Sequence, residues 1–160
     1  MLGTILPGAQ HLQNIHPLVV HCPLVLLPGA ALLYALAWLV GRESLAWTAL
    51  WVLSLGTASA AAAAGTGLYA DEGVMVDPTV REQLLDPHKL WMLSTLGLSA
   101  ALTVWALAGR PFPARGRGAF VLLLLVLLAV MAHGADYGGR LVYDYNAGGN
   151  ACGQPIEFTR

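Results

Sequence analysis

The sequence predicts an all-α membrane protein, a single domain whose four transmembrane helices form an up-down bundle. Hydrophobic side chains make up 57% of the 160 residues and charged side chains only 11%, whereas about a quarter of a soluble globular chain is charged. Four apolar stretches each approach the roughly 20 residues that a helix needs to cross a bilayer. The net charge of −1 and the absence of a basic run argue against a nucleic-acid partner.

The four spans are separated by polar connectors. The first connector is Gly41 to Ser44, and the prolines between Gly109 and Pro113 end the third span because proline lacks a backbone N–H. The expected spans are residues 17–40, 45–70, 88–108 and 118–137, with an outer loop at 71–87 and a polar tail at 146–160.

Two Asp-Pro pairs predict helix starts within the outer loop. Asp86-Pro87 is typical of an N-cap followed by the first helical residue, so we expect the third span to begin with His88 in its first turn. Asp77-Pro78 repeats the signal and predicts a short surface helix that ends before the third span. That helix is expected to turn its apolar residues to the membrane: Val80, Leu84 and Leu85.

An even number of spans places both ends of the chain on one side of the membrane. Short, arginine-dense connectors mark the cytoplasmic side, and here the two sides carry equal numbers of basic residues. The connector side has Arg42, Arg110, Arg115 and Arg117, and the other side has Arg81, Lys89, Arg140 and Arg160. The density of the first set predicts that both termini lie outside.

All five histidines are expected at the same end of the bundle. They are His11 and His16 before the first span, His21 in its first turns, His88 at the start of the third and His133 near the end of the fourth. His133 lies about 22 Å along its helix from the start of the span, in the outer third of the membrane. Ionisable groups at that depth usually face the bundle interior. We expect His21, His88 and His133 to share a ligand, the alternative being separate hydrogen bonds to headgroups or water.

Imidazoles without thiolate or carboxylate partners suit haem iron, copper or zinc. We favour b-type haem, because the second span carries a stripe of small residues that a flat ring could approach. The stripe is Gly56, Ala60, Ala63 and Gly67. Close packing between helices explains the same stripe equally well, and Gly134 and Gly138 on the fourth span are open to both interpretations.

Because the connectors are short, spans that follow one another in the sequence should also be adjacent in space. The first and third spans should therefore lie diagonally across the bundle. His21 and His88 are then the expected axial ligands, with His133 as a substitute and His16 as a supporting or propionate-binding residue. Propionates need cationic or hydroxyl donors at the water edge. The donors expected there are Lys89, Arg140, Tyr137 and Tyr69.

A copper or zinc site is the alternative. Its ligands would come from His16, His21, Cys22, His88 and His133, with Met75 or Met92, and zinc would require three or four of them to converge. Cys22 and Cys152 could form a disulfide if the termini face an oxidising compartment. No phosphate loop, nucleophile elbow or zinc-protease helix is present, which favours an electron-transfer subunit over an enzyme.

The ends of the chain resemble a known family. His16-Pro-Leu-Val-Val-His-Cys-Pro-Leu24 resembles the "HPxxVHFPI" opening of bacterial four-helix membrane proteins catalogued as domain of unknown function 2231, and Gly138-Gly-Arg-Leu-Val-Tyr143 resembles their closing "GGxLVY". The resemblance covers nearly the whole chain. Cys22 departs from the usual phenylalanine, and Asp144-Tyr145 follows where a "GxGV" ending is usual.

The resemblance implies an electron-transfer setting, because such relatives occur fused to c-type cytochrome or Rieske-like modules. Family positions are matched by His16, His21, His88, Arg140 and Tyr143. The expected protein is therefore a cytochrome-like subunit in the lipid of the bacterial inner membrane, with both termini periplasmic. It would bind one haem near the outer face and connect a quinol pool with a c-type cytochrome or Rieske-like protein. The alternatives are a membrane protein that handles copper, zinc or iron, and a cofactor-free structural subunit.

Overall fold

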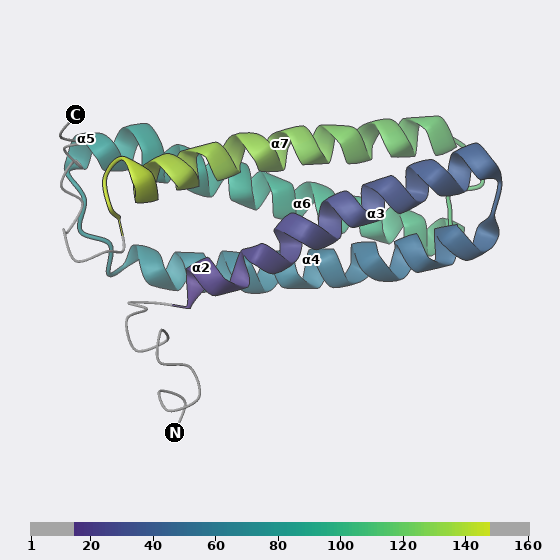
Figure 1. The fold of residues 1–160 in the computed structure, drawn as a ribbon, viewed down its shortest axis with the longest axis horizontal. Coiled ribbons are helices and arrows are strands. Elements are labelled where there is room, and N and C mark those ends of the chain that lie inside the picture. The colour runs from purple at the N-terminus through teal and green to yellow at the C-terminus, as the bar shows by residue number, and fades with distance from the viewer. Residues whose placement is uncertain (1–14, 148–160) are drawn as a thin grey trace, which may run out of the picture.

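The computed structural model describes residues 15–147, which form an antiparallel bundle of long helices (Figure 1). The elements are α2 (His16–Val19), α3 (His21–Val40), α4 (Glu43–Asp71), α5 (Pro78–Val80), the π-helical turn η2 (Arg81–Leu85), α6 (Asp86–Gly109) and α7 (Arg117–Tyr143). α2 and α3 form one span, and α5, η2 and α6 form another. Within the described residues there are thus four helices long and apolar enough to cross a membrane, which confirms the predicted all-α membrane fold.

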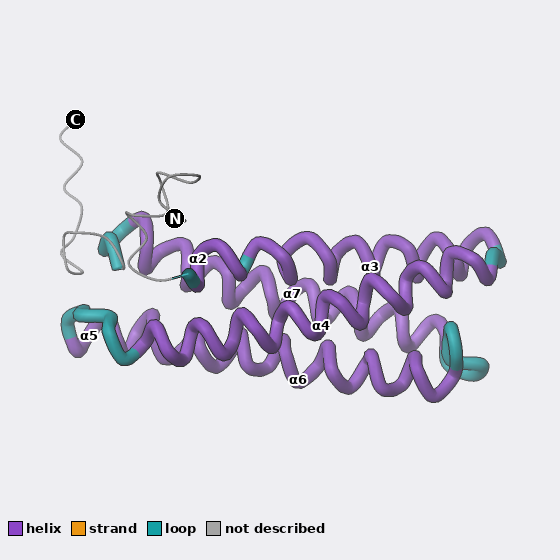
Figure 2. The backbone as a smooth tube through the Cα atoms, turned by 90° about the horizontal axis from the view of Figure 1, so that it is seen from below, coloured by secondary structure: helices purple, strands orange, loops and turns teal. Residues whose placement is uncertain are grey.

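The four spans occupy the corners of a square. α3 packs against α4 and α7, and α6 packs against the same two helices, so α3 and α6 are diagonal, as are α4 and α7. The connectors at residues 41–42 and 110–116 lie together at one end of the bundle, called the connector end below (Figure 2). The loop at 72–77 and both ends of the described chain lie at the opposite, terminal end.

The tight connector between α3 and α4 depends on one glycine. Gly41 ends α3 with a φ of 67°, in the left-handed region that a residue without Cβ adopts at little cost. The chain therefore reverses within two residues, which sets α3 and α4 side by side along their length.

The third span begins ten residues earlier than the sequence predicted. Asp77 does cap a helix, since its Oδ1 accepts the backbone N–H of Thr79 at 2.8 Å. Asp86, however, has helical dihedral angles and caps nothing, and one helix continues to Gly109. Proline in a helix removes a hydrogen bond and crowds the preceding turn. The wide π turn η2, directly before Asp86-Pro87, accommodates that disruption, so the helix does not stop.

The apolar residues of this added segment do not face the membrane, contrary to expectation. Val80, Leu84 and Leu85 are buried against Leu141 of α7. They turn inward because α5 and η2 continue the line of α6, and this line lies beside the end of α7 (Figure 1).

The large apolar side chains form two separate clusters. The larger one fills the connector half and includes Tyr34, Phe120 and Leu124, all fully buried. The smaller one closes the terminal end around Val80, Leu84, Leu85 and Leu141. Between the two clusters, the buried residues that the structure describes are all small. They are Pro23, Ala60, Ala63, Thr95 and Gly134. The histidines of interest lie in this stretch.

Candidate functional site

Two histidines lie half-buried between the two apolar clusters. His16 begins α2, and its seven-residue spacing from buried Pro23 places it on the inner face of the first span. His88 lies in the first turn of α6 and has the same spacing from buried Thr95. Seven residues are about two helical turns, so each histidine continues the row of residues that its span buries.

The imidazole of His16 is anchored to α4. Its Nδ1 lies 3.2 Å from Oγ1 of Thr66. The Thr66 hydroxyl has one proton, which it directs to the carbonyl oxygens of Ala62 and Ala63, each 3.0 Å away. Either atom can be the donor in the contact between Nδ1 and Oγ1, depending on the tautomer of the ring, and the ring also hydrogen-bonds the backbone of Ala63. In the tautomer with the proton on Nδ1, the threonine oxygen accepts and Nε2 has the lone pair.

The imidazole of His88 is anchored to α7 in the same way. Its Nδ1 lies 2.8 Å from the carbonyl oxygen of Gly134. A carbonyl can only accept, so Nδ1 carries the proton and Nε2 has the lone pair. Both inward histidines thus have Nδ1 hydrogen-bonded to a neighbouring helix, through different partners on different helices.

Each ring rests on a glycine. A Cβ added to Gly67 would lie 2.8 Å from Cε1 of His16, and one added to Gly138 would lie 2.8 Å from Cε1 of His88. Real Cβ atoms do not approach that closely, so any larger residue at either position would force the imidazole to move. These two glycines, called the glycine seats below, lie on α4 and α7, which are diagonal to each other. The two imidazoles are close enough to interact electrostatically.

The two imidazoles are side chains that could hold a metal or a haem. Histidines that bind a metal usually donate the second ring N–H to a carbonyl or similar acceptor, which orients the ring and raises its basicity. His88 has this arrangement, as does His16 when its proton is on Nδ1. A haem needs only two axial side chains, whereas a metal held by protein alone needs three or more. Over residues 15–147, no three His, Cys, Asp or Glu side chains lie close enough to hold a metal ion.

His21 and His133, which were expected to meet His88, lie on the outside of the bundle. Both side chains are exposed. His21 is five residues from His16, a spacing that rotates it away from the inner face of its helix. His133 is adjacent in sequence to the buried Gly134, so it points to a different side of α7. The structure therefore brings His16 toward His88 and leaves His21 and His133 apart from that pair.

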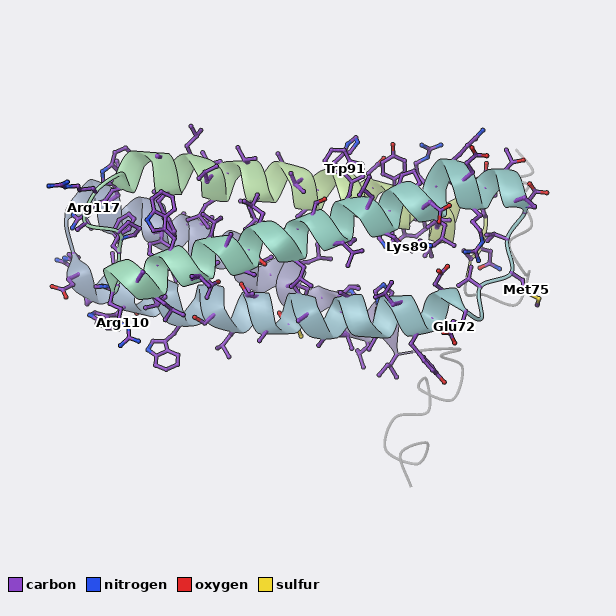
Figure 3. The ribbon with its side chains drawn as sticks, turned by 180° about the vertical axis from the view of Figure 1, so that it is seen from behind. Glu72, Met75, Lys89, Trp91, Arg110 and Arg117 are labelled. Carbon is purple, nitrogen blue, oxygen red and sulfur yellow. The ribbon has the colours of Figure 1, made fainter. Side chains whose placement is uncertain are left out.

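Of the expected propionate donors, the two cations are paired with carboxylates and the two tyrosines are not. Lys89 projects from α6 toward α4 (Figure 3), and its Nζ lies 3.0 Å from Asp71 and 2.8 Å from Asp86. Arg140 lies 3.7 Å from Asp144. The phenol ring of Tyr137 packs edge-on against His133 and against the smaller apolar cluster, while Tyr69 is exposed.

The small-residue stripe of α4 has two uses along its length. At Gly56, an added Cβ would lie 2.9 Å from Cδ2 of Leu27, so this end permits close packing with α3. At Gly67, eleven residues later, the same face seats His16. The stripe thus serves close helix packing at Gly56 and contact with an imidazole at Gly67, and the approach of a porphyrin to it stays a prediction.

Thr66 is the site residue that sequence reasoning missed. The sequence did contain a pattern that could have identified it, since Thr66 lies immediately before Gly67 at the end of the stripe of small residues. The role of His16 also had a signal, because it lies seven residues before Pro23 and eleven before Leu27, on a helical repeat. The first span is apolar on almost every side, however, so the repeat does not stand out.

The other candidates for metal binding are dispersed. Cys22 is exposed, Met75 lies in the loop at the terminal end (Figure 3), and Met92 packs against Gly134. His11, Cys152 and residues 148–160 of the polar tail lie outside the described residues, as does the proposed disulfide partner of Cys22.

Fold and site together define a four-helix membrane protein with an inward pair of histidines near one end. The chain belongs to the family described as Predicted membrane protein (DUF2231), which matches residues 12–151, so the family resemblance of its two end motifs is confirmed. No curated protein and no solved structure matches the chain.

Proposed function

We propose that this protein is a cytochrome-like electron-transfer subunit that binds one b-type haem between His16 and His88. The observation that carries the proposal is the matched anchoring of the two rings. Each imidazole rests on a glycine and has its Nδ1 hydrogen-bonded to another helix. A histidine that only filled space would not need the same Nδ1 anchor on a neighbouring helix and the same glycine contact as its counterpart.

The structure favours His16 over His21 as the partner of His88. His16 is half-buried and interacts with His88, whereas His21 is exposed and its ring makes no hydrogen bond within residues 15–147. The proposal therefore keeps one ligand of the pair expected from the sequence and replaces the other.

The surrounding residues would orient the ligands and leave room for a ring. A bound haem supplies one-electron ferric–ferrous chemistry. Thr66 and Gly134 would hold the two imidazoles so that Nε2 of each could bind the iron. The buried side chains near them are small, and Met92, whose flexible side chain contacts Gly134, is the bulkier neighbour that a porphyrin would displace. Asp71, bound to Lys89 and Arg81, ties α4 to α6 at the terminal end.

The charge distribution supports an orientation with the terminal end outside. Arg110 and Arg117 lie at the connector end (Figure 3) together with Arg42 and Arg115, and Glu43 is the one described carboxylate there. The terminal end has an excess of carboxylates over its three described cations. These carboxylates are Asp71, Glu72, Asp77, Glu82, Asp86, Asp136 and Asp144. An arginine-rich connector end is typical of the cytoplasmic side.

In this orientation the haem would lie near the periplasmic face of the inner membrane. It would receive electrons from a membrane quinol pool and pass them to an external redox protein. The family resemblance suggests a c-type cytochrome or a Rieske-like protein as that acceptor.

The test is the optical spectrum of the full-length protein, purified after expression with ample haem supply. We expect a Soret band and reducible α and β bands of a low-spin haem. His16→Ala and His88→Ala should each abolish the low-spin spectrum, whereas the matched control His21→Ala, at an exposed histidine on the same span, should retain it. A spectrum that is lost in His21→Ala and kept in His16→Ala would overturn the ligand assignment.

The same purified protein also tests the two alternative functions. A colourless protein with stoichiometric copper, zinc or iron would reject the haem proposal in favour of metal handling. A protein with neither haem nor metal, whose His16/His88 double variant still supports its membrane complex, would be a structural subunit.

A further inference from the structure

His133 presents an imidazole to the lipid-facing side of the bundle. It is exposed and precedes Gly134, whose carbonyl oxygen binds His88, so it is level with the proposed haem site. It lies about 24 Å along α7 from Arg117 at about 1.5 Å per residue, within an apolar layer about 30 Å thick. A polar side chain at this depth is costly without a partner.

Two aromatic side chains, Trp91 and Tyr137, hold the His133 ring in place, and these three residues are called the frame below. The indole of Trp91 meets it edge-on, with ring centroids 4.6 Å apart and planes at 80°. The phenol of Tyr137, one turn later on α7, meets it at 5.3 Å and 89°. Trp91 lies on the side of α6 opposite Lys89 (Figure 3), with its Cβ against Gly134. The imidazole is therefore framed by α6 and α7 together rather than extended toward the headgroups.

The surroundings select the chemistry of a ligand. The lipid-facing apolar side chains around the frame are Leu90, Leu93, Ala129 and Ala132, and the exposed Ser94 beside them donates its hydroxyl to the carbonyl oxygen of Leu90. Two charged side chains continue the face of His133 on α7: Asp136 lies one turn away, and Arg140 lies two turns away, 3.7 Å from Asp144. The nearer charge is therefore a carboxylate, which disfavours an anionic phosphate and accepts a hydrogen bond from a neutral hydroxyl. The fitting ligand is neutral, flat and lipid-soluble, with oxygen atoms that form hydrogen bonds.

We propose that His133, Trp91 and Tyr137 form a lipid-facing site for the ring of a membrane quinone or quinol. A carbonyl or hydroxyl oxygen of the ligand would form a hydrogen bond with His133. The two aromatic side chains would line the ring of the ligand. The use of this site in electron transfer rests on the proposed haem at His88, one helix turn from Trp91. Binding itself requires only the three residues of the frame.

The test measures binding of a short-chain benzoquinone to the full-length protein in nanodiscs of zwitterionic phospholipid, followed by quenching of tryptophan fluorescence. We expect saturable quenching in the wild type and a dissociation constant about tenfold or more higher in His133→Leu. His133→Gln keeps a donor and an acceptor and should lose less affinity. The control His21→Leu, at an exposed histidine outside the frame, should bind as the wild type does. Equal dissociation constants for wild type and His133→Leu would overturn the proposal.

Two further arms separate the remaining explanations. Added anionic phospholipid should not displace the quinone, and displacement would assign the site to a lipid headgroup instead. Haem content is measured on the same samples. Quinone binding that depends on His133 in a haem-free protein would reject the haem proposal alone, whereas a haem-loaded protein without such binding would reject the quinone site alone.

Discussion

Nδ1 of His88 lies 2.8 Å from the carbonyl oxygen of Gly134, so a side chain of α6 is tied to the backbone of α7. The tie is possible because Gly138, one turn further along α7, has no side chain to hold the ring away. His16 has the equivalent relationship with Thr66 and Gly67 of α4. The two diagonal helices thus each seat one imidazole, and this arrangement leads to predictions about stability as well as about cofactor binding.

Alanine at either glycine seat should disturb the site. In Gly67→Ala and Gly138→Ala the new methyl group would lie 2.8 Å from a histidine ring, and such overpacking costs about 1–3 kcal/mol. We expect a lower thermal midpoint by circular dichroism in detergent and a loss of low-spin haem. Gly65→Ala and Gly97→Ala are matched controls, because an added Cβ meets nothing within 4 Å at either position. A seat variant as stable as these controls would contradict the geometry.

Thr66→Val should remove the hydrogen bond at Nδ1 of His16 without changing the shape of the site. Valine has no oxygen for that bond, whereas Thr66→Ser keeps one. Nitrogen NMR of labelled histidine should show the same Nδ1 signal in the wild type and Thr66→Ser, and a shifted signal in Thr66→Val. With haem bound, loss of the acceptor makes the ligand less basic, so the midpoint potential should rise in Thr66→Val. Identical spectra and potentials in all three proteins would refute the role of Thr66.

Asp71→Asn should weaken the terminal end of the bundle modestly. Asp71 binds Arg81 at 2.8 Å and Lys89 at 3.0 Å, which joins the end of α4 to the third span. All three side chains are partly exposed, so the expected loss is about 1 kcal/mol, and it should shrink in high salt. Glu72→Gln is the neighbouring control, since Glu72 forms no ion pair within residues 15–147. Thermal unfolding at low and high salt measures the difference, and equal effects of both substitutions would argue against the bridge.

Tyr34→Phe should destabilise the connector end. The buried Tyr34 hydroxyl donates to the carbonyl oxygen of Pro111 at 3.0 Å, and its ring packs against Phe112 and Phe120. Phenylalanine keeps the ring contacts and leaves the carbonyl unpaired, which costs about 1–3 kcal/mol. Tyr69→Phe, at a phenol that is 79% exposed, should be neutral in the same unfolding measurement. A neutral Tyr34→Phe would mean that another group satisfies Pro111.

Much of the fold follows from local sequence. Composition and the length of the apolar stretches predict four membrane helices, and the structure has four. The end of the third span at Gly109 to Pro113 was also predictable, because glycine and proline act locally. The beginning of that span was not. Asp86-Pro87 has the local signal of a helix start, but the π turn before it allows the helix to continue, and a π turn has no comparable sequence signature.

The sequence by itself determined the class of protein, the end of the bundle at which the histidines gather, and the supply of small residues beside them. Only the tertiary structure decided that His16, not His21, turns toward His88, and that His133 faces outward between two aromatic rings. The physical reason is that an apolar span can bury almost any of its faces. Rotation about its axis is set by contacts with other helices, here a threonine and two glycines more than forty residues distant from the histidines that they seat.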